Sequence, residues 1–211
     1  MNKSNQPKLW TFEFSVLCAA SLLIYSAQMM LNPTIQMYVK DRLGLGSTEV
    51  GLAGTMFTMA ALFARPLSGY AVDRWNRRVV LIISTIWFAL SMSAHSLVNT
   101  FGLLLVMRLL HGLPFSSVTT ALNTVATDLV PPARRGEGIS VFGFTQALGQ
   151  AAGPYLAFSA LDGLGLHCRP GLSQYVAQLE ATRTVYIILQ AGLAEMKTGG
   201  KPFNGHGWLS P

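Results

Sequence analysis

Long apolar runs alternate with short polar segments along most of the chain. The first run, from Phe14 to Val39, contains no Asp, Glu, Lys, Arg or His, and the third, from Val79 to Val98, contains no Asp, Glu, Lys or Arg. Apolar runs of about 20 residues are long enough to cross the ~30 Å hydrocarbon core of a bilayer as helices. The pattern predicts an all-α membrane protein with five transmembrane helices, over residues 14–39, 50–72, 79–98, 101–127 and 138–160.

The composition leads to the same class of protein. Of the 211 residues, 51% are hydrophobic and only 11% are charged, whereas about a quarter of the residues in soluble domains are charged. The net charge of +6 is spread over short loops without a basic face, so nucleic acid is not expected as a partner. Cys18 and Cys168 make no disulfide or metal-binding framework, and neither a cofactor nor a metal is expected.

The positive charges predict the orientation of the chain in the membrane. Cytoplasmic loops of membrane proteins carry an excess of Lys and Arg. If the amino terminus is inside, the inner segments hold seven such residues and the outer loops two. The inner residues are Lys3, Lys8, Arg74, Arg77, Arg78, Arg134 and Arg135, and the outer ones are Lys40 and Arg42. We therefore expect a cytoplasmic amino terminus, in the inner (plasma) membrane of a bacterium.

The segment after residue 160 has a different character. Its longest strongly apolar stretch, Thr184 to Ala194, would cover only about 16 Å of the hydrocarbon core as a helix, at about 1.5 Å per residue. We divide the chain into a helical bundle over residues 1–160 and a divergent tail over 161–211. The tail is predicted to hold a short amphipathic helix and a disordered, Gly- and Pro-rich end.

The loop between the second and third runs reads Gly69-Tyr-Ala-Val-Asp73-Arg74-Trp-Asn76-Arg77-Arg78. Placed between two spans, it resembles the loop between the second and third helices of the major facilitator superfamily of transporters. Asn76 stands where the family usually has glycine, and Asn tolerates a left-handed backbone best among the other residues. The resemblance implies that Asp73 and the arginines form an inner gate.

Asp128 is expected at the inner end of the fourth helix, where it can pair with the loop arginines as a latch. The alternative is that the loop charges only anchor the topology. The predicted inner-gate network consists of Gly69, Asp73, Arg74, Arg77, Arg78 and Asp128.

Arg108 lies inside the fourth apolar run, where a guanidinium costs at least about 2.5 kcal/mol on insertion scales. Such a residue faces a cavity or a partner, or its side chain extends to the outer interface. The segment from Arg108 through His111 and Gly112 to Pro114 resembles the fourth-helix signature of the same superfamily, in which the arginine is linked to proton coupling. His111 stands where the family often has glutamine, and alone it would more often be a packing residue.

The fifth run contains Gly149-Gln-Ala-Ala-Gly153-Pro154, which resembles the Gly-x-x-x-Gly-Pro signature of proton-linked exporters. Small residues four apart also let helices approach closely, so ordinary packing is the alternative. Polar residues within the spans are expected to line a substrate cavity or to bond between helices: Tyr25, Gln28, Asn123 and Gln146. The predicted transport and proton-coupling residues are Arg108, His111 and Gln146.

Together the three signatures identify residues 12–158 as similar to the amino-terminal half of a major facilitator transporter. The function implied is proton-coupled efflux of a small molecule, with the lipid bilayer, the substrate, protons and a second copy or a separate carboxy-terminal half as partners. Because the resemblance ends there, we expect a truncated chain. The alternatives are a non-transporting membrane protein or scaffold and, least favoured, a membrane enzyme that uses His95 and His111, since no carboxylate or cysteine accompanies them at ligand spacing.

Overall fold

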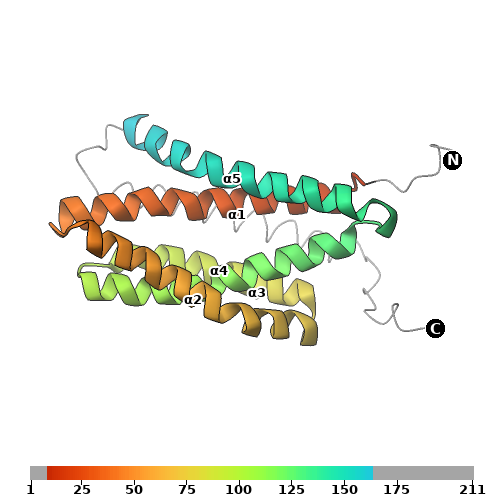
Figure 1. The fold of residues 1–211 in the computed structure, drawn as a ribbon, viewed down its shortest axis with the longest axis horizontal. Coiled ribbons are helices and arrows are strands. Elements are labelled where there is room, and N and C mark those ends of the chain that lie inside the picture. The colour runs from red at the N-terminus through yellow and green to blue at the C-terminus, as the bar shows by residue number, and fades with distance from the viewer. Residues whose placement is uncertain (1–8, 164–211) are drawn as a thin grey trace.

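The computed structural model describes residues 9–163, which form a bundle of five long helices (Figure 1). The helices are α1 (Phe12–Met37), α2 (Ser47–Arg74), α3 (Arg77–Ala94), α4 (Phe101–Leu129) and α5 (Arg135–Gly163). Three short turns connect them: the π-helical η2 (Tyr38–Arg42) and the 3-10 turns η3 (His95–Leu97) and η4 (Pro132–Arg134). The tail beyond residue 163 lies outside the described residues, so its predicted amphipathic helix and the domain division stay predictions.

Four of the described helices are long and apolar enough to cross a membrane, one fewer than predicted. They cover Phe12–Arg42, Ser47–Arg74, Arg77–Ala94 and Phe101–Leu129. The fifth predicted span does form a helix of 29 residues, which at about 1.5 Å per residue is about 43 Å long. Six of its residues are glycine and two are glutamine, so its composition rather than its length separates α5 from the others.

Side chains at the loop ends explain where several helices begin. The hydroxyl of Thr11 accepts from the backbone N–H of Phe14 at 3.2 Å, and Thr100 does the same for Leu103 at 3.4 Å. Asn76 caps α3 in the same way, because its Oδ1 accepts from the N–H of Arg78 at 3.0 Å. Its backbone is extended, with φ of −62° and ψ of 118°, so the turn does not require a left-handed residue at this position.

The helices pack in two groups. The most extensive contacts join α2 to α4, α1 to α5 and α3 to α4. In Figure 1, α5 runs along α1, and α2, α3 and α4 lie together on the other side of α1. Gly112 permits the α2–α4 contact, since a Cβ atom there would lie 2.6 Å from the Phe57 carbonyl oxygen and 2.7 Å from the Ala60 Cβ. Side chains on α1, α3 and α4 fill the space between the two groups.

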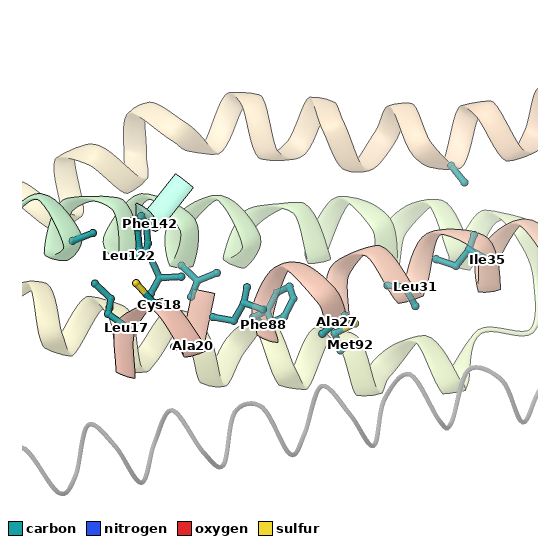
Figure 2. Packing of buried hydrophobic residues seen from close by; sticks show 14 of the residues in the cluster. Leu17, Cys18, Ala20, Ala27, Leu31, Ile35, Phe88, Met92, Leu122 and Phe142 are labelled. Carbon is teal, nitrogen blue, oxygen red and sulfur yellow. The ribbon is translucent and has the colours of Figure 1, made fainter. Parts of the chain in front are cut away.

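The core is apolar, and so is the outer surface of the bundle. Figure 2 shows buried Leu31, Phe88, Met92 and Leu122 among the side chains that α1, α3 and α4 direct toward one another. Outward-facing positions also carry large apolar side chains, such as Leu67, which is 71% exposed. A surface of this kind suits lipid and would be a liability in water.

Candidate functional site

A buried polar cluster lies where α1, α3 and α4 meet, with α2 beside it. His111 of α4 is fully buried, and both of its ring nitrogens are in hydrogen-bond contact. Its Nε2 lies 2.7 Å from Oε1 of Gln28 in α1, and its Nδ1 lies 2.8 Å from Oγ of Ser91 in α3. The rings of Phe57 and Phe88 flank the imidazole at 5.6 Å and 5.0 Å between centroids. His111, predicted from the sequence to be a proton-coupling residue with packing as the alternative, is thus the centre of an interhelical network.

The Ser91 hydroxyl gives this network two self-consistent arrangements. Its oxygen lies 2.8 Å from the carbonyl oxygen of Phe88 as well as 2.8 Å from His111 Nδ1, but it has one hydrogen to donate. When the imidazole is neutral, with its proton on Nε2 facing Gln28, Ser91 donates to Nδ1. When the imidazole is protonated, Nδ1 donates to Ser91, whose hydroxyl then donates to Phe88. Rotation of one hydroxyl accommodates both states without loss of a bond to the ring.

A second buried histidine lies next to the cluster. His95 in η3 has its Nδ1 2.8 Å from the carbonyl oxygen of Ser91, and its ring centroid is 5.2 Å from that of His111. Three or more His, Cys, Asp or Glu side chains do not gather at any point within residues 9–163 in a way that could hold a metal ion. Both histidines are in hydrogen-bond contact with Ser91, His111 with its hydroxyl and His95 with its backbone carbonyl.

Arg108 is directed into the bundle and not toward the outer headgroups. Its side chain is 3% exposed, and its Nη2 donates to Oδ1 of Asn32 in α1 at 3.1 Å. The guanidinium carbon lies 5.3 Å from the ring centroid of Phe57 in α2. Nε and Nη1 are buried without a hydrogen-bond acceptor among the described residues. Arg108 and His111 are three residues apart on α4, so both face the same interior region.

Gln146 was predicted to act with Arg108 and His111, but it lies away from the buried cluster around His111. Its Nε2 donates to Oδ1 of Asn123 at 3.1 Å, on an exposed face between α5 and α4. Asn123 is twelve residues beyond His111 on α4, about 18 Å along the helix. The predicted coupling set therefore divides into a buried pair and a separate polar contact nearer the end of α4 that carries Asp128.

Of the predicted inner-gate network, two members contact each other. Arg77 donates to the carboxylate of Asp128 and forms an ion pair with it. The Arg74 guanidinium lies 5.1 Å from the ring centroid of Tyr70 instead. Asp73 is exposed, and a Cβ at Gly69 would meet no atom within 4 Å. The backbone N–H of Arg78 donates to the cap residue Asn76. The exposed members lie on the outside of the described bundle.

The ion pair is expected to contribute little to stability, because the Arg77 and Asp128 side chains are 35% and 26% exposed. Solvent screens such pairs, and measured couplings are at most about 1 kcal/mol. A double-mutant cycle with Arg77→Gln and Asp128→Asn, read by thermal unfolding in detergent, should give a coupling free energy below about 1 kcal/mol. A coupling of about 3 kcal/mol would mean that the pair is shielded from water and acts as a structural lock.

Another ion pair at this end was missed by sequence reasoning. Arg134 donates to both carboxylate oxygens of Glu137, at 2.9 Å from Nε and 2.7 Å from Nη2. These hydrogen bonds lower the pKa of the Glu137 carboxyl and keep it ionised in the first turn of α5. The three-residue spacing between the two residues was the available signal.

The α5 glycines lie against α1. A Cβ at Gly149 would lie 2.5 Å from the Leu22 carbonyl oxygen, and one at Gly153 would lie 2.5 Å from the Met29 Cβ. Ser26 of α1 donates to the Gly149 carbonyl at 3.1 Å. Pro154 follows inside the helix. The motif therefore brings α1 and α5 into close contact along one face, whatever further role it has.

Two residues of the site had no distinct signal in the sequence. Ser91 is one of several hydroxyl residues in its apolar run, and Asn32 is one of three Asn and Gln residues in the first run. Gln28 was expected to line a substrate cavity or to bond between helices, and its hydrogen bond to His111 joins α1 to α4.

The chain matches a known protein family over most of its length. The family model described as Major Facilitator Superfamily matches residues 17–188, so the match continues past residue 158. Protein spinster homolog 1 from Rattus norvegicus is 26% identical over 204 residues, covering 92% of this chain and 37% of the relative. Quinolone resistance protein NorA from Staphylococcus aureus (strain Mu50 / ATCC 700699) is 21% identical over 171 residues, covering 81% and 40%.

Among solved structures, a bacterial homolog to the human lysosomal transporter Spinster, in an inward-facing and unoccupied conformation, superposes with a TM-score of 0.67. The identity is 20%, and the match covers 87% of this chain and 43% of that one. At this identity the likeness shows the fold alone. The chain thus spans about two fifths of the length of the relatives it matches.

Proposed function

The chain belongs to the major facilitator superfamily, a family of membrane transporters and not of enzymes, and from this premise we propose that it takes part in proton-coupled export of a small molecule. The observation that carries the proposal is the buried His111, whose contacts with Gln28 and Ser91 accommodate both the neutral and the protonated ring. A proton can therefore bind and leave in the interior while the heavy atoms stay in place.

Arg108 supports a coupling role for this region. An uncompensated guanidinium is among the most costly groups to keep inside a span, and ionisable residues there mark transport pathways in other membrane proteins. Arg108 and His111 lie on adjacent turns of α4, so the charge on one repels a proton on the other. A ligand that changes the field at Arg108 would change the affinity of His111 for a proton.

Export, rather than uptake, is proposed from the fifth helix. The segment Gly149 to Pro154 resembles the exporter signature, and a relative at 21% identity is named as a quinolone resistance protein. We also propose that the amino terminus is cytoplasmic, in the inner membrane of a bacterium, because this orientation places seven basic residues inside and two outside.

Because the relatives are more than twice as long, we propose that transport requires a second copy or a separate carboxy-terminal half. Major facilitator transporters work as two bundles that rock about a central site. Gly69 and Asp73 lie on the outside of the described bundle, where a second bundle could contact them. The same exposed face also suits the second candidate function, a non-transporting membrane protein or partner-binding scaffold.

An efflux assay separates the two candidates. Vesicles that contain the chain, with and without a co-expressed carboxy-terminal half from a relative, would be energised with a pH gradient and loaded with a fluorescent quinolone. We expect flux that depends on the gradient and falls at least tenfold in Arg108→Ala, while Arg42→Gln, on the exposed outer turn, stays at the parental rate. Inserted, folded protein with no gradient-dependent flux in either format would favour the scaffold.

A further inference from the structure

The membrane-embedded part of the described bundle contains cationic side chains but no carboxylate in its middle. Arg65 lies within α2 and Arg108 within α4. Every acidic residue of residues 9–163 is near a helix end: Glu13, Asp41, Glu49, Asp73, Asp128, Glu137 and Asp162. Arg65 is exposed on the outside of the bundle and Arg108 is buried, so the interior of the described bundle holds the positive charge of Arg108 without a carboxylate paired to it.

Arg108 carries this argument, because its charge is buried and incompletely bonded. A guanidinium has five N–H donors, and the acceptor seen here is the neutral amide oxygen of Asn32. The other close neighbour, the Phe57 ring, offers only the weaker attraction of a cation to an aromatic face. Nε and Nη1 are buried and lack an acceptor within residues 9–163. A buried charge of this kind is normally paired with an opposite charge.

We propose that Arg108 anchors an anion-binding site and that the cargo is a small organic anion with an apolar body. The carboxylate, or an anionic group of similar chemistry, accepts from the free guanidinium donors. The apolar body would contact the half-buried rings of Phe57 and Phe115, whose centroids are 5.4 Å apart. This inference rests on the proposed transport function and names the substrate class of that site.

The same charge argument ranks the alternatives. A cationic cargo would approach an uncompensated guanidinium in a medium of low dielectric, where like charges repel strongly. A neutral cargo of the same shape would gain the aromatic contacts but leave Nε and Nη1 with a weaker acceptor or none. The expected order of affinity is anion, then neutral molecule, then cation.

The test is equilibrium binding to the full chain in nanodiscs of phosphatidylcholine, whose zwitterionic headgroup carries no net negative charge. The probes are benzoate, benzyl alcohol and benzylamine, which share a ring and differ in charge. We expect benzoate to bind saturably and at least tenfold more tightly than benzyl alcohol, with benzylamine weakest. Arg108→Gln should reduce benzoate affinity at least tenfold and remove the preference, whereas Arg42→Gln, an equal loss of charge on the exposed outer turn, should leave both unchanged.

Three results would overturn the proposal: no saturable benzoate binding to the parental chain, equal affinity for the three probes, or unchanged affinity in Arg108→Gln. In the first case the counter-charge of Arg108 would have to come from another source, such as a carboxylate side chain of a second bundle. If Arg108→Gln does not fold, Arg108→Lys keeps the charge and should keep the preference for benzoate over benzylamine. Binding needs no gradient, so flux without Arg108-dependent benzoate binding sinks this inference alone, and such binding without flux sinks the export proposal alone.

Discussion

Replacing Gly112 by valine is expected to prevent most of the protein molecules from folding. The added Cβ would lie 2.6 Å from the carbonyl oxygen of Phe57, 2.7 Å from the Cβ of Ala60 and 3.0 Å from the backbone nitrogen of Ala61. Two of these three atoms belong to the α2 backbone, so no side-chain rotation relieves the overlap. Overpacking costs about 1 to 3 kcal/mol where side chains can adjust, and more where they cannot. Because α2–α4 is one of the three main contacts of the bundle, the loss spreads beyond one pair of helices.

Size-exclusion chromatography of a fluorescent fusion in detergent measures this effect, as the yield of monodisperse protein and its thermal midpoint. Gly54→Val is the matched control, because Gly54 is also in a membrane helix and a Cβ there meets no atom within 4 Å. The control should elute at the parental position with a similar midpoint. Parental yield and midpoint in Gly112→Val would mean that α2 and α4 are farther apart than the structure has them.

The sequence predicted the helices because apolar length is a local property. Each long apolar run became a helix, with ends moved outward by a few residues where caps such as Thr11 and Asn76 lie. The count of spans was one too high for a related reason. The fifth run was interpreted by its lack of charge, while its glycines lower its apolar character and serve the contact with α1.

The sequence predicted a residue of the functional site only where placing that residue inside a membrane span costs much free energy. Arg108 stood out because a charge in a span demands an explanation. The partners of His111 come from positions 83 and 20 residues away, Gln28 and Ser91, and no spacing along the chain predicts that three helices bring them together. Gln146 was assigned to the same set because it is polar within an apolar run, but polarity alone contains no information on depth along the bundle.

The loop that joins α2 to α3 shows a further limit of motifs. The segment from Gly69 to Arg78 has the residues of the family pattern, and Arg77 of that segment forms an ion pair with Asp128, while Asp73 is exposed. The exposure of Asp73 is explained if the motif is complementary to a second bundle, since half of an interface has no partner to bond to. If the proposed second bundle exists, a pattern read from this chain predicts residues whose contacts lie outside the described bundle.

Replacing His111 by glutamine is expected to remove the response of transport to pH while leaving the fold intact. Glutamine is polar, fits a helical position and can bond to Gln28 and Ser91, but it cannot gain a proton. With one proton moved per cycle, each unit of pH gradient changes the equilibrium accumulation of cargo tenfold, equivalent to about 1.4 kcal/mol. In His111→Gln the accumulation of cargo should no longer change with the pH gradient. Its flux should also be equal at pH 5.5 and pH 8, the two ends of a pH series.

A leucine at the same position separates coupling from structure. His111→Leu leaves Gln28 Oε1 buried without its partner, which costs about 1 to 3 kcal/mol. We expect a lower thermal midpoint in His111→Leu, a midpoint near the parental one in His111→Gln, and no pH response in either. Ser117→Ala is the control, because Ser117 lies on the same helix and bonds to Ser68 at 3.0 Å, away from the cluster. A parental pH response in His111→Gln would place the titrating group elsewhere, and a parental midpoint in His111→Leu would mean that water satisfies Gln28.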